Sequence, residues 1–286
     1  MNTQEVGYKA KSFEARNLII YFLLAFGLTW ITTAIIYIFD LKLPTSVSDP
    51  VTPLNVLIGT LGTTGPFLAA FIVTAFSEGK PEVRALWKRF WNRNVSLKWL
   101  VAILLFYNTC RLIANLIARA VDGQTYPIID PSSSLWMFIP ALIAAFILSG
   151  MGEEFGWRGY VLPRFQTRWN ALTSSIILGV IWVSWHIPFF FTPGLSLYQR
   201  NFWHWVPLVL LSSVIHTWFF NNTKGSVLAA ALFHATLNSS LVILPTQDSL
   251  WYYYGILFFA VILIVVIFGP KNLVRQSVKD ESPVSE

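Results

Sequence analysis

"LWMFIPALIAAFILSGMGEEFGWR", residues 135–158, is an apolar run that ends in two adjacent acids and an arginine. About 20 apolar residues are enough for a helix to cross a bilayer. Ionisable groups are costly in hydrocarbon, so those found within a membrane helix usually face a cavity or a partner. We therefore expect this stretch to form a membrane helix that contributes polar groups to a functional site.

The composition of the whole chain places it in a membrane. Of its 286 residues, 55% are hydrophobic and 12% are charged, whereas a soluble domain has about 25% charged residues. We predict an all-α, polytopic membrane bundle, formed by one integral membrane domain over residues 1–268 with its motifs in 135–245, and a disordered cytoplasmic tail over 269–286. The predicted spans, about eight in number, are 17–39, 54–76, 97–119, 135–157, 171–190, 203–221, 226–245 and 249–268.

The basic residues indicate how the chain is oriented. Of its 20 Lys and Arg residues, 16 lie at the N-terminus, in 80–98, in 158–168, at Lys224 and in the tail. Basic residues close to membrane helices stay on the cytoplasmic side, so we expect a multi-pass protein of the cell membrane with both termini cytoplasmic. The stretch "EGKPEVRALWKRFWNRN", 78–94, mixes aromatic and basic residues and predicts an interfacial amphipathic helix. The basic excess favours contact with anionic lipids and not with nucleic acid.

Two predicted helical hairpins bring polar groups to a similar depth. Glu153 and His186 are equally distant from the turn at 166–172, which places both about 25 Å from it. His234 and Asn238 share one helical face, and they lie about 14 and 20 Å from the turn at 221–226. We expect the four side chains to meet in the inner half of the bilayer.

These groups suit the activation of water, because no Ser or Cys nucleophile has an obvious partner. A partly desolvated carboxylate is an effective base near neutral pH, and imidazole and amide groups can donate hydrogen bonds to an oxyanion. The set predicts hydrolysis of an amide or ester. A zinc site formed by Glu153, His186 and His234 is the alternative, although the chain contains no H-E-x-x-H motif.

Other polar residues in the predicted spans have simpler interpretations. Glu154 and Arg158 are spaced i,i+4, which favours a structural ion pair. His216 is a lone histidine, for which we expect a packing role. Arg111 is expected to neutralise a buried acid or to bind a phosphate.

Three short motifs, in order along the chain, resemble those of the CPBP intramembrane proteases, also called the CAAX-protease or Abi family. "EEFGWR" matches E-E-x-x-x-R, and "HATLN", 234–238, matches H-x-x-x-N. "WVSWH", 182–186, matches F-x-x-x-H except that Trp182 replaces the phenylalanine. Eukaryotic members are the type II CAAX prenyl endopeptidases, which remove the last three residues of prenylated proteins.

The resemblance implies a role for each matching residue. Glu153 would activate water with the help of His186, and His234 and Asn238 would form the oxyanion hole. Glu154 and Arg158 would orient the site. The implied partners are membrane lipids and a peptide or membrane-protein substrate. We expect no cofactor, with zinc as the alternative.

Non-catalytic functions remain the competing class. A membrane immunity or scaffold protein could keep these motifs without turnover. A transporter would show duplicated halves, and we find no repeat in the sequence. An intramembrane endopeptidase is therefore the favoured function.

Overall fold

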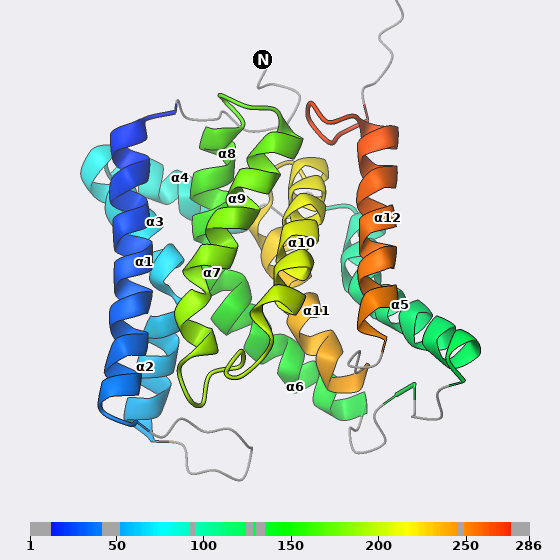
Figure 1. Ribbon diagram of the computed structural model, residues 1–286. Helices are drawn as coiled ribbons and strands as arrows, with labels where there is room; N and C mark the ends of the chain where they lie inside the picture. Colours follow the sequence, from blue (N-terminus) through cyan, green and yellow to red (C-terminus); the bar gives the residue numbers. More distant parts are fainter. Residues whose placement is uncertain are drawn as a thin grey trace, which may run out of the picture.

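The fold is described by a computed structural model that covers residues 13–41, 52–91, 95–123, 128–129, 135–244 and 249–275. Within these ranges the regular structure is entirely helical. The α-helices are α1 (Ala15–Ile38), α2 (Pro53–Thr63), α3 (Gly65–Ser77), α4 (Lys80–Phe90), α5 (Leu97–Val121), α6 (Leu135–Ala145), α7 (Gly152–Gly156), α8 (Leu162–Phe165), α9 (Ala171–Trp185), α10 (Phe202–Asn222), α11 (Val227–Ile243) and α12 (Leu250–Phe268). Most of them pack side by side as a bundle, in which α1, α9, α10 and α12 run roughly parallel and α5 and α6 are tilted (Figure 1).

Helices occupy all the segments predicted to span the membrane, and the all-helical class is confirmed. Among the described residues, four continuous helical stretches are long and apolar enough to cross a bilayer: Ala15–Ile38, Leu97–Val121, Trp136–Phe165 and Leu250–Phe268. A bent pair, Leu57–Thr63 with Gly65–Ser77, raises this number to five. The structure therefore supports a membrane protein, while eight spans and cytoplasmic termini stay predictions.

The second predicted span is broken by 66° between α2 and α3. Pro66 lies in the first turn of α3, and a proline cannot continue the hydrogen bonds of a preceding helix. Gly65 packs so closely on α1 that a Cβ atom there would lie 2.6 Å from the Ala25 carbonyl oxygen. Glycine at the break thus lets α3 lie directly against α1.

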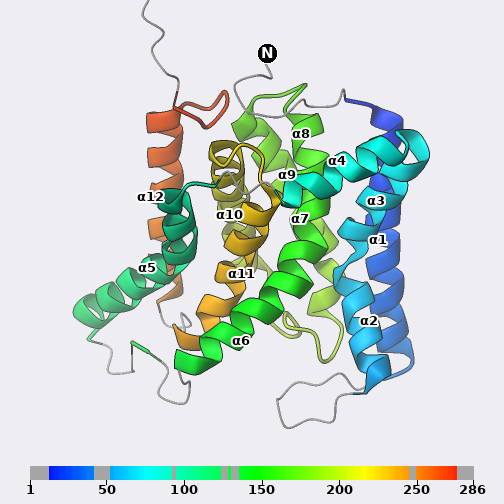
Figure 2. The same ribbon diagram turned by 180° about the vertical axis from the view of Figure 1, so that it is seen from behind.

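The amphipathic stretch forms α4, which crosses one end of the bundle (Figure 2). The side chains of Leu86 and Phe90, on one face of α4, are buried. The Trp87 and Phe90 rings both stack on Phe155, with centroids 5.6 Å and 5.4 Å away. The apolar face of α4 therefore packs against α7, which contains the two glutamates.

A short segment after α12 accepts hydrogen bonds from the start of α9 and from the end of α10. The backbone N–H groups of Ala171 and Leu172 donate to the carbonyls of Lys271 and Pro270. These bonds satisfy donors at the start of α9 that have no partner within the helix. The side chains of Asn221 and Asn222, at the end of α10, donate to two further carbonyls of this segment, 270–273, each at 2.8 Å. The segment belongs to the predicted tail, whose residues 276–286 lie outside the described residues.

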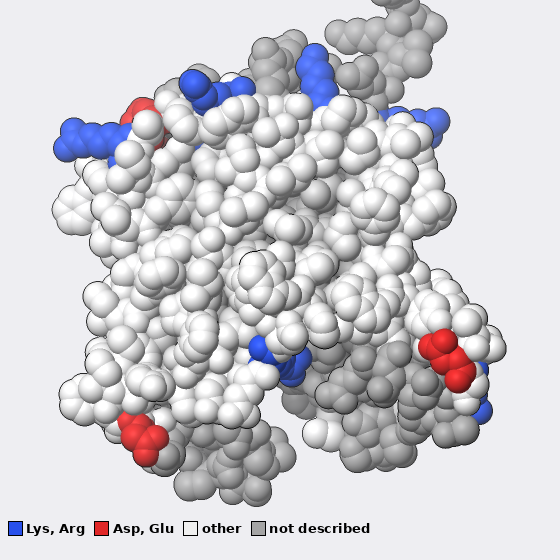
Figure 3. All heavy atoms as spheres, in the orientation of Figure 1, with Lys and Arg blue, Asp and Glu red and all other residues white. Residues whose placement is uncertain are grey.

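Charge is unevenly distributed over the surface. In Figure 3, Lys and Arg side chains gather at the end of the bundle where α1 begins and α12 ends, with fewer at the opposite end. A broad belt without charged groups separates the two ends on this face. Large apolar side chains such as Leu23, Trp136 and Val266 are exposed. An apolar belt of this kind is what lipid chains would surround.

Candidate active site

The two glutamates lie on α7, between two segments of π-helix, Phe146–Met151 and Trp157–Val161. Interruptions of this type are frequent at functional sites. Glycines at 150 and 156 bring α7 close to its neighbours: a Cβ atom at Gly150 would lie 2.5 Å from the Ala231 carbonyl oxygen, and one at Gly156 would lie 2.6 Å from that of Pro66. The motif helix is thus enclosed by α3 on one side and α11 on another.

Glu153 is buried, and its two carboxylate oxygens have different surroundings. Oε2 accepts two indole hydrogen bonds, from Trp182 Nε1 at 2.7 Å and from Trp157 Nε1 at 3.2 Å. Oε1 lies 3.9 Å from His234 Nε2. One oxygen is therefore anchored, and the other faces an imidazole.

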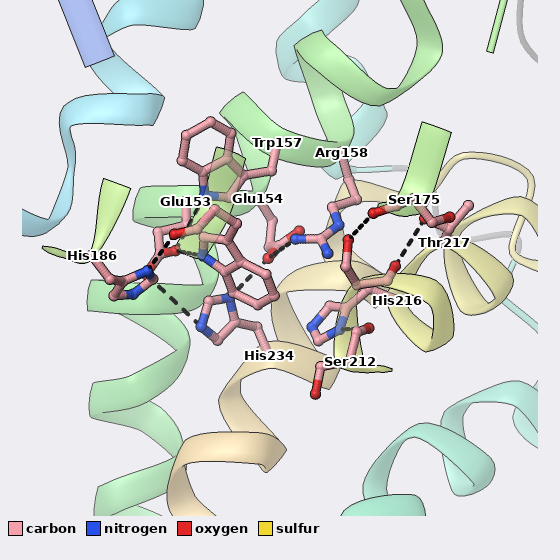
Figure 4. Close-up of polar contacts among 12 residues, drawn as sticks. Glu153, Glu154, Trp157, Arg158, Ser175, His186, Ser212, His216, Thr217 and His234 are labelled. Carbon is pink, nitrogen blue, oxygen red and sulfur yellow. Dashed lines mark hydrogen bonds and ion pairs between the residues drawn. The ribbon is translucent and has the colours of Figure 1, made fainter. Parts of the chain in front are cut away.

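Glu154 forms a buried three-part contact with Arg158 and His234. Its Oε1 accepts from Arg158 Nη1 at 3.0 Å and contacts His234 Nδ1 at 2.8 Å. The predicted i,i+4 ion pair is present, with both side chains fully buried. The carboxylate thus joins α7 to α11, which are far apart in sequence (Figure 4).

His186 lies at the C-terminal end of α9, just after Trp185, where the chain turns into a 3₁₀-helix, Ile187–Phe190. Pro188 lies in this turn, as expected from the helix-breaking effect of proline. His186 Nδ1 lies 2.8 Å from the Trp182 carbonyl oxygen. A ring that donates from Nδ1 can present its other nitrogen, and Figure 4 shows the His186 ring beside Glu153 and His234.

Asn238 lies one helical turn beyond His234 on α11, as predicted, and its side chain is partly exposed. Its amide makes no hydrogen bond to another described residue, whereas His234 is buried between the glutamates. The structure thus brings together Glu153, Glu154, Arg158, His186 and His234, which we call the polar cluster, while Asn238 lies one turn of α11 beyond His234.

His216 is closer to the polar cluster than its expected packing role suggests. Its ring centroid lies 5.8 Å from that of His234, and its Nδ1 lies 2.8 Å from the Ser212 carbonyl oxygen. Among the described residues, Glu154, His216 and His234 form the one group whose ligand atoms lie within 4.8 Å of one another. This group differs from the expected zinc ligands, Glu153, His186 and His234.

Arg111 lies away from the polar cluster, on α5. Its Nε donates to Ser240 Oγ at 2.8 Å, and its guanidinium lies 4.5 Å from the Tyr253 ring centroid. The residue therefore links α5 to α11 and α12.

Two tryptophans in this site are not identified by sequence reasoning. Trp182 and Trp157 fall outside the expected set of site residues, yet both donate to Glu153. The departure of Trp182 from the F-x-x-x-H pattern is the one signal that points to it. Trp157 lies inside the E-E-x-x-x-R motif at a position the pattern leaves free.

Known proteins similar to this chain include CAAX prenyl proteases. The family described as "Type II CAAX prenyl endopeptidase Rce1-like" matches residues 135–240. CAAX prenyl protease 2 of Methanococcus maripaludis is 26% identical over 243 residues, which cover 80% of this chain and 86% of that protein.

Proteins of a second kind match less of the chain. Lysostaphin resistance protein A of Staphylococcus haemolyticus is 25% identical over 64% of this chain, and its counterpart in Staphylococcus epidermidis has the same identity over the same share. The alignments span 48% and 46% of these two proteins.

The family match covers all three motifs and the whole polar cluster. The similarity to the archaeal protease extends over most of the chain. The similarity to CAAX prenyl endopeptidases therefore supports a peptide hydrolase related to the CPBP, or CAAX-protease, family.

Proposed function

We propose that this protein is an intramembrane endopeptidase in which Glu153 activates the water that attacks the peptide bond. The observation that carries the proposal is the asymmetry of the Glu153 carboxylate. Oε2 is engaged by two indole N–H groups, while Oε1 lies near His234 within an apolar bundle. A carboxylate fixed through one oxygen presents the lone pairs of the other in a defined direction, as a general base requires.

His186 assists the base in this proposal. Its Nδ1–H donates to the Trp182 carbonyl, which leaves Nε2 as an acceptor. A water held between Glu153 Oε1 and His186 Nε2 would have both of its hydrogens directed to acceptors. Its oxygen lone pair would then be directed at the substrate carbonyl.

The contact of His234 Nδ1 with Glu154 determines whether His234 Nε2 can donate a hydrogen bond. The carboxylate accepts the Nδ1 hydrogen, so Nε2 can donate to an oxyanion only when the ring carries both protons. An imidazolium would give the polar cluster two positive and two negative groups, with Arg158 as the other cation. This balance reduces the cost of burying four charges. Asn238, one turn away, would supply the second oxyanion donor.

The proposed steps balance in atoms and protons. Water adds to the carbonyl carbon as its proton moves to Glu153, and the carbonyl oxygen becomes an oxyanion facing His234 and Asn238. The C–N bond then breaks as Glu153 returns the proton to the leaving amine. The products are a carboxylic acid and an amine, which become a carboxylate and an ammonium group when the remaining proton of the water moves to the amine, and Glu153 is regenerated as a carboxylate.

We favour a metal-free reaction because the donor groups fit zinc poorly. Glu154 Oε1 and His234 Nδ1 are already engaged with each other, and Arg158 shares the same carboxylate oxygen. A guanidinium at this distance opposes the binding of a cation. In the alternative set, Oε2 of Glu153 is occupied by two indole donors.

The proposed setting is a multi-pass protein with eight spans and both termini cytoplasmic. The polar cluster would face the cytoplasmic half of the bilayer, where peptide or membrane-protein substrates would reach it. The archaeal relative is named as a CAAX prenyl protease, so a prenylated CAAX peptide is the first substrate to test.

A comparison of membranes would test the proposal whatever the natural substrate is. Cells producing the protein would be compared with cells producing Glu153→Ala at equal abundance, and new peptide termini would be identified by mass spectrometry. We expect termini that are present with the unchanged protein and absent with the variant. Identical termini in both membranes would contradict a peptidase function.

A further inference from the structure

Trp182 occupies the motif position where the family pattern has phenylalanine, and it makes a contact that phenylalanine cannot make. Its indole N–H donates to Glu153 Oε2 at 2.7 Å, the shorter of the two hydrogen bonds to that oxygen. Both partners are buried. A hydrogen bond to a charged acceptor is stronger and more directional than a neutral one, so this contact can hold the carboxylate in one orientation.

The same side chain touches the rest of the polar cluster. Arg158 lies over the indole ring, with its Cζ atom 4.7 Å from the ring centroid. The ring centroids of His234 and His186 lie 5.3 Å and 6.0 Å from that of Trp182. Trp182 therefore contacts the base through its N–H and the supporting arginine through its ring face, and its rotamer is restricted by packing on several sides.

Backbone geometry connects Trp182 to His186 as well. The Trp182 carbonyl oxygen lies 2.8 Å from His186 Nδ1. A shift of this residue would move both groups that are proposed to hold the water. One tryptophan on α9 thus couples the orientation of Glu153, from α7, to that of His186.

We propose that Trp182 is a positioning residue that holds Glu153 through Oε2 and so directs Oε1 toward the attacking water. This inference rests on the proposed function. It assigns to the indole a task that a phenylalanine at this position would leave to other donors, such as Trp157.

The test compares Trp182→Phe with Trp185→Phe. Phenylalanine keeps a ring at both positions. Trp185 is equally buried on the same helix, and its N–H donates to the Ala25 carbonyl at 3.3 Å, away from Glu153. The probe is an internally quenched peptide with a farnesylated CAAX end. We expect W182F to lower kcat about 10- to 100-fold, as for the loss of one hydrogen bond to a charged group, with KM unchanged. W185F should change kcat less than about threefold, because the bond it loses is to a neutral carbonyl.

A second measurement separates this inference from the proposed function. Unfolding midpoints in detergent are measured for both tryptophan variants, each with and without Glu153→Ala. We expect W182F to lower the unfolding midpoint at most half as much in the Glu153→Ala protein as in the protein with Glu153. W185F should lower the midpoint by the same amount with and without Glu153→Ala.

Additive shifts for W182F and E153A, or an unchanged kcat in W182F, would overturn the role of Trp182. A protein that releases no peptide termini would contradict the proposed peptidase function. If the effects of W182F and E153A on its unfolding midpoint are still non-additive, the contact by which Trp182 holds Glu153 would remain supported.

Discussion

Replacing Arg158 by methionine tests the buried ion pair beneath the candidate site. The guanidinium and the Glu154 carboxylate are 3.0 Å apart and fully buried. At an effective dielectric constant of about 20, opposite charges at this distance attract by about 5 kcal/mol. The ring of Trp182 adds a cation–π contact at 4.7 Å. The variant keeps most of the side-chain volume, so the expected loss comes mainly from the missing charge.

The expected cost is about 3 to 5 kcal/mol in the free energy of unfolding, because an uncompensated buried carboxylate remains. The contact of His234 with Glu154 survives the change, which favours the lower end of this range. Removing the carboxylate charge as well, in Glu154→Gln/Arg158→Met, should recover about 1 to 3 kcal/mol of the sum of the single losses.

Unfolding by denaturant in mixed micelles, followed by helical circular dichroism, measures these differences. Arg168→Met is the matched control, because Arg168 is exposed on the turn that follows α8. The control should change the stability by less than about 0.5 kcal/mol. If Arg158→Met unfolds at the same midpoint as this control, or if the double variant costs the full sum, the ion pair does not stabilise the fold as argued.

Three further predictions concern topology, packing and metal. Reporter fusions at Lys88 and Arg168 should read cytoplasmic and one near Arg200 external, and the opposite pattern would reverse the predicted orientation. Gly156→Ala should destabilise the protein by about 1 to 3 kcal/mol, since the added Cβ would meet Pro66 and Tyr21, whereas Gly255→Ala, with open space around it, should not lower the melting temperature. Protein shown to be metal-free by elemental analysis should still cleave the peptide, and added zinc should inhibit it; activity that vanishes with the metal and returns with about one equivalent of zinc would establish the metal-dependent alternative.

The sequence carried information about the elements and about local pairs. Runs of apolar residues predict helices because a backbone in lipid must satisfy its own hydrogen bonds, and the helices appear where these runs lie. The Glu154–Arg158 contact was also predictable, since residues four apart on a helix are neighbours whatever surrounds them. The three motifs resemble those of the CPBP proteases, and the match to the CAAX endopeptidase family covers the same region.

The distance of each residue from its turn predicts only part of the arrangement in the site. Counting residues from the turn placed Glu153 opposite His186, but the residue of α9 that bonds to Glu153 is Trp182, one helical turn earlier. Helix α9 ends at Trp185, so His186 lies where the chain already turns. Rise per residue gives the depth of a backbone position to within about a turn of 5.4 Å, and a hydrogen bond needs a precision of a few tenths of an ångström.

What the sequence alone determined is which segments are helical, which residues share a face and which chemistry the residue types allow. What only the tertiary structure decided is how each helix is rotated and shifted against the others. In the folded protein, Trp182 donates a hydrogen bond to Glu153 Oε2 and His234 contacts the Glu154 carboxylate. The His216 ring lies beside that of His234. The physical reason is that periodicity is a property of one helix, whereas the fit between two helices depends on the shapes of all the side chains between them. Single glycines also matter, such as Gly150, which lets the π-helical segment before α7 approach α11.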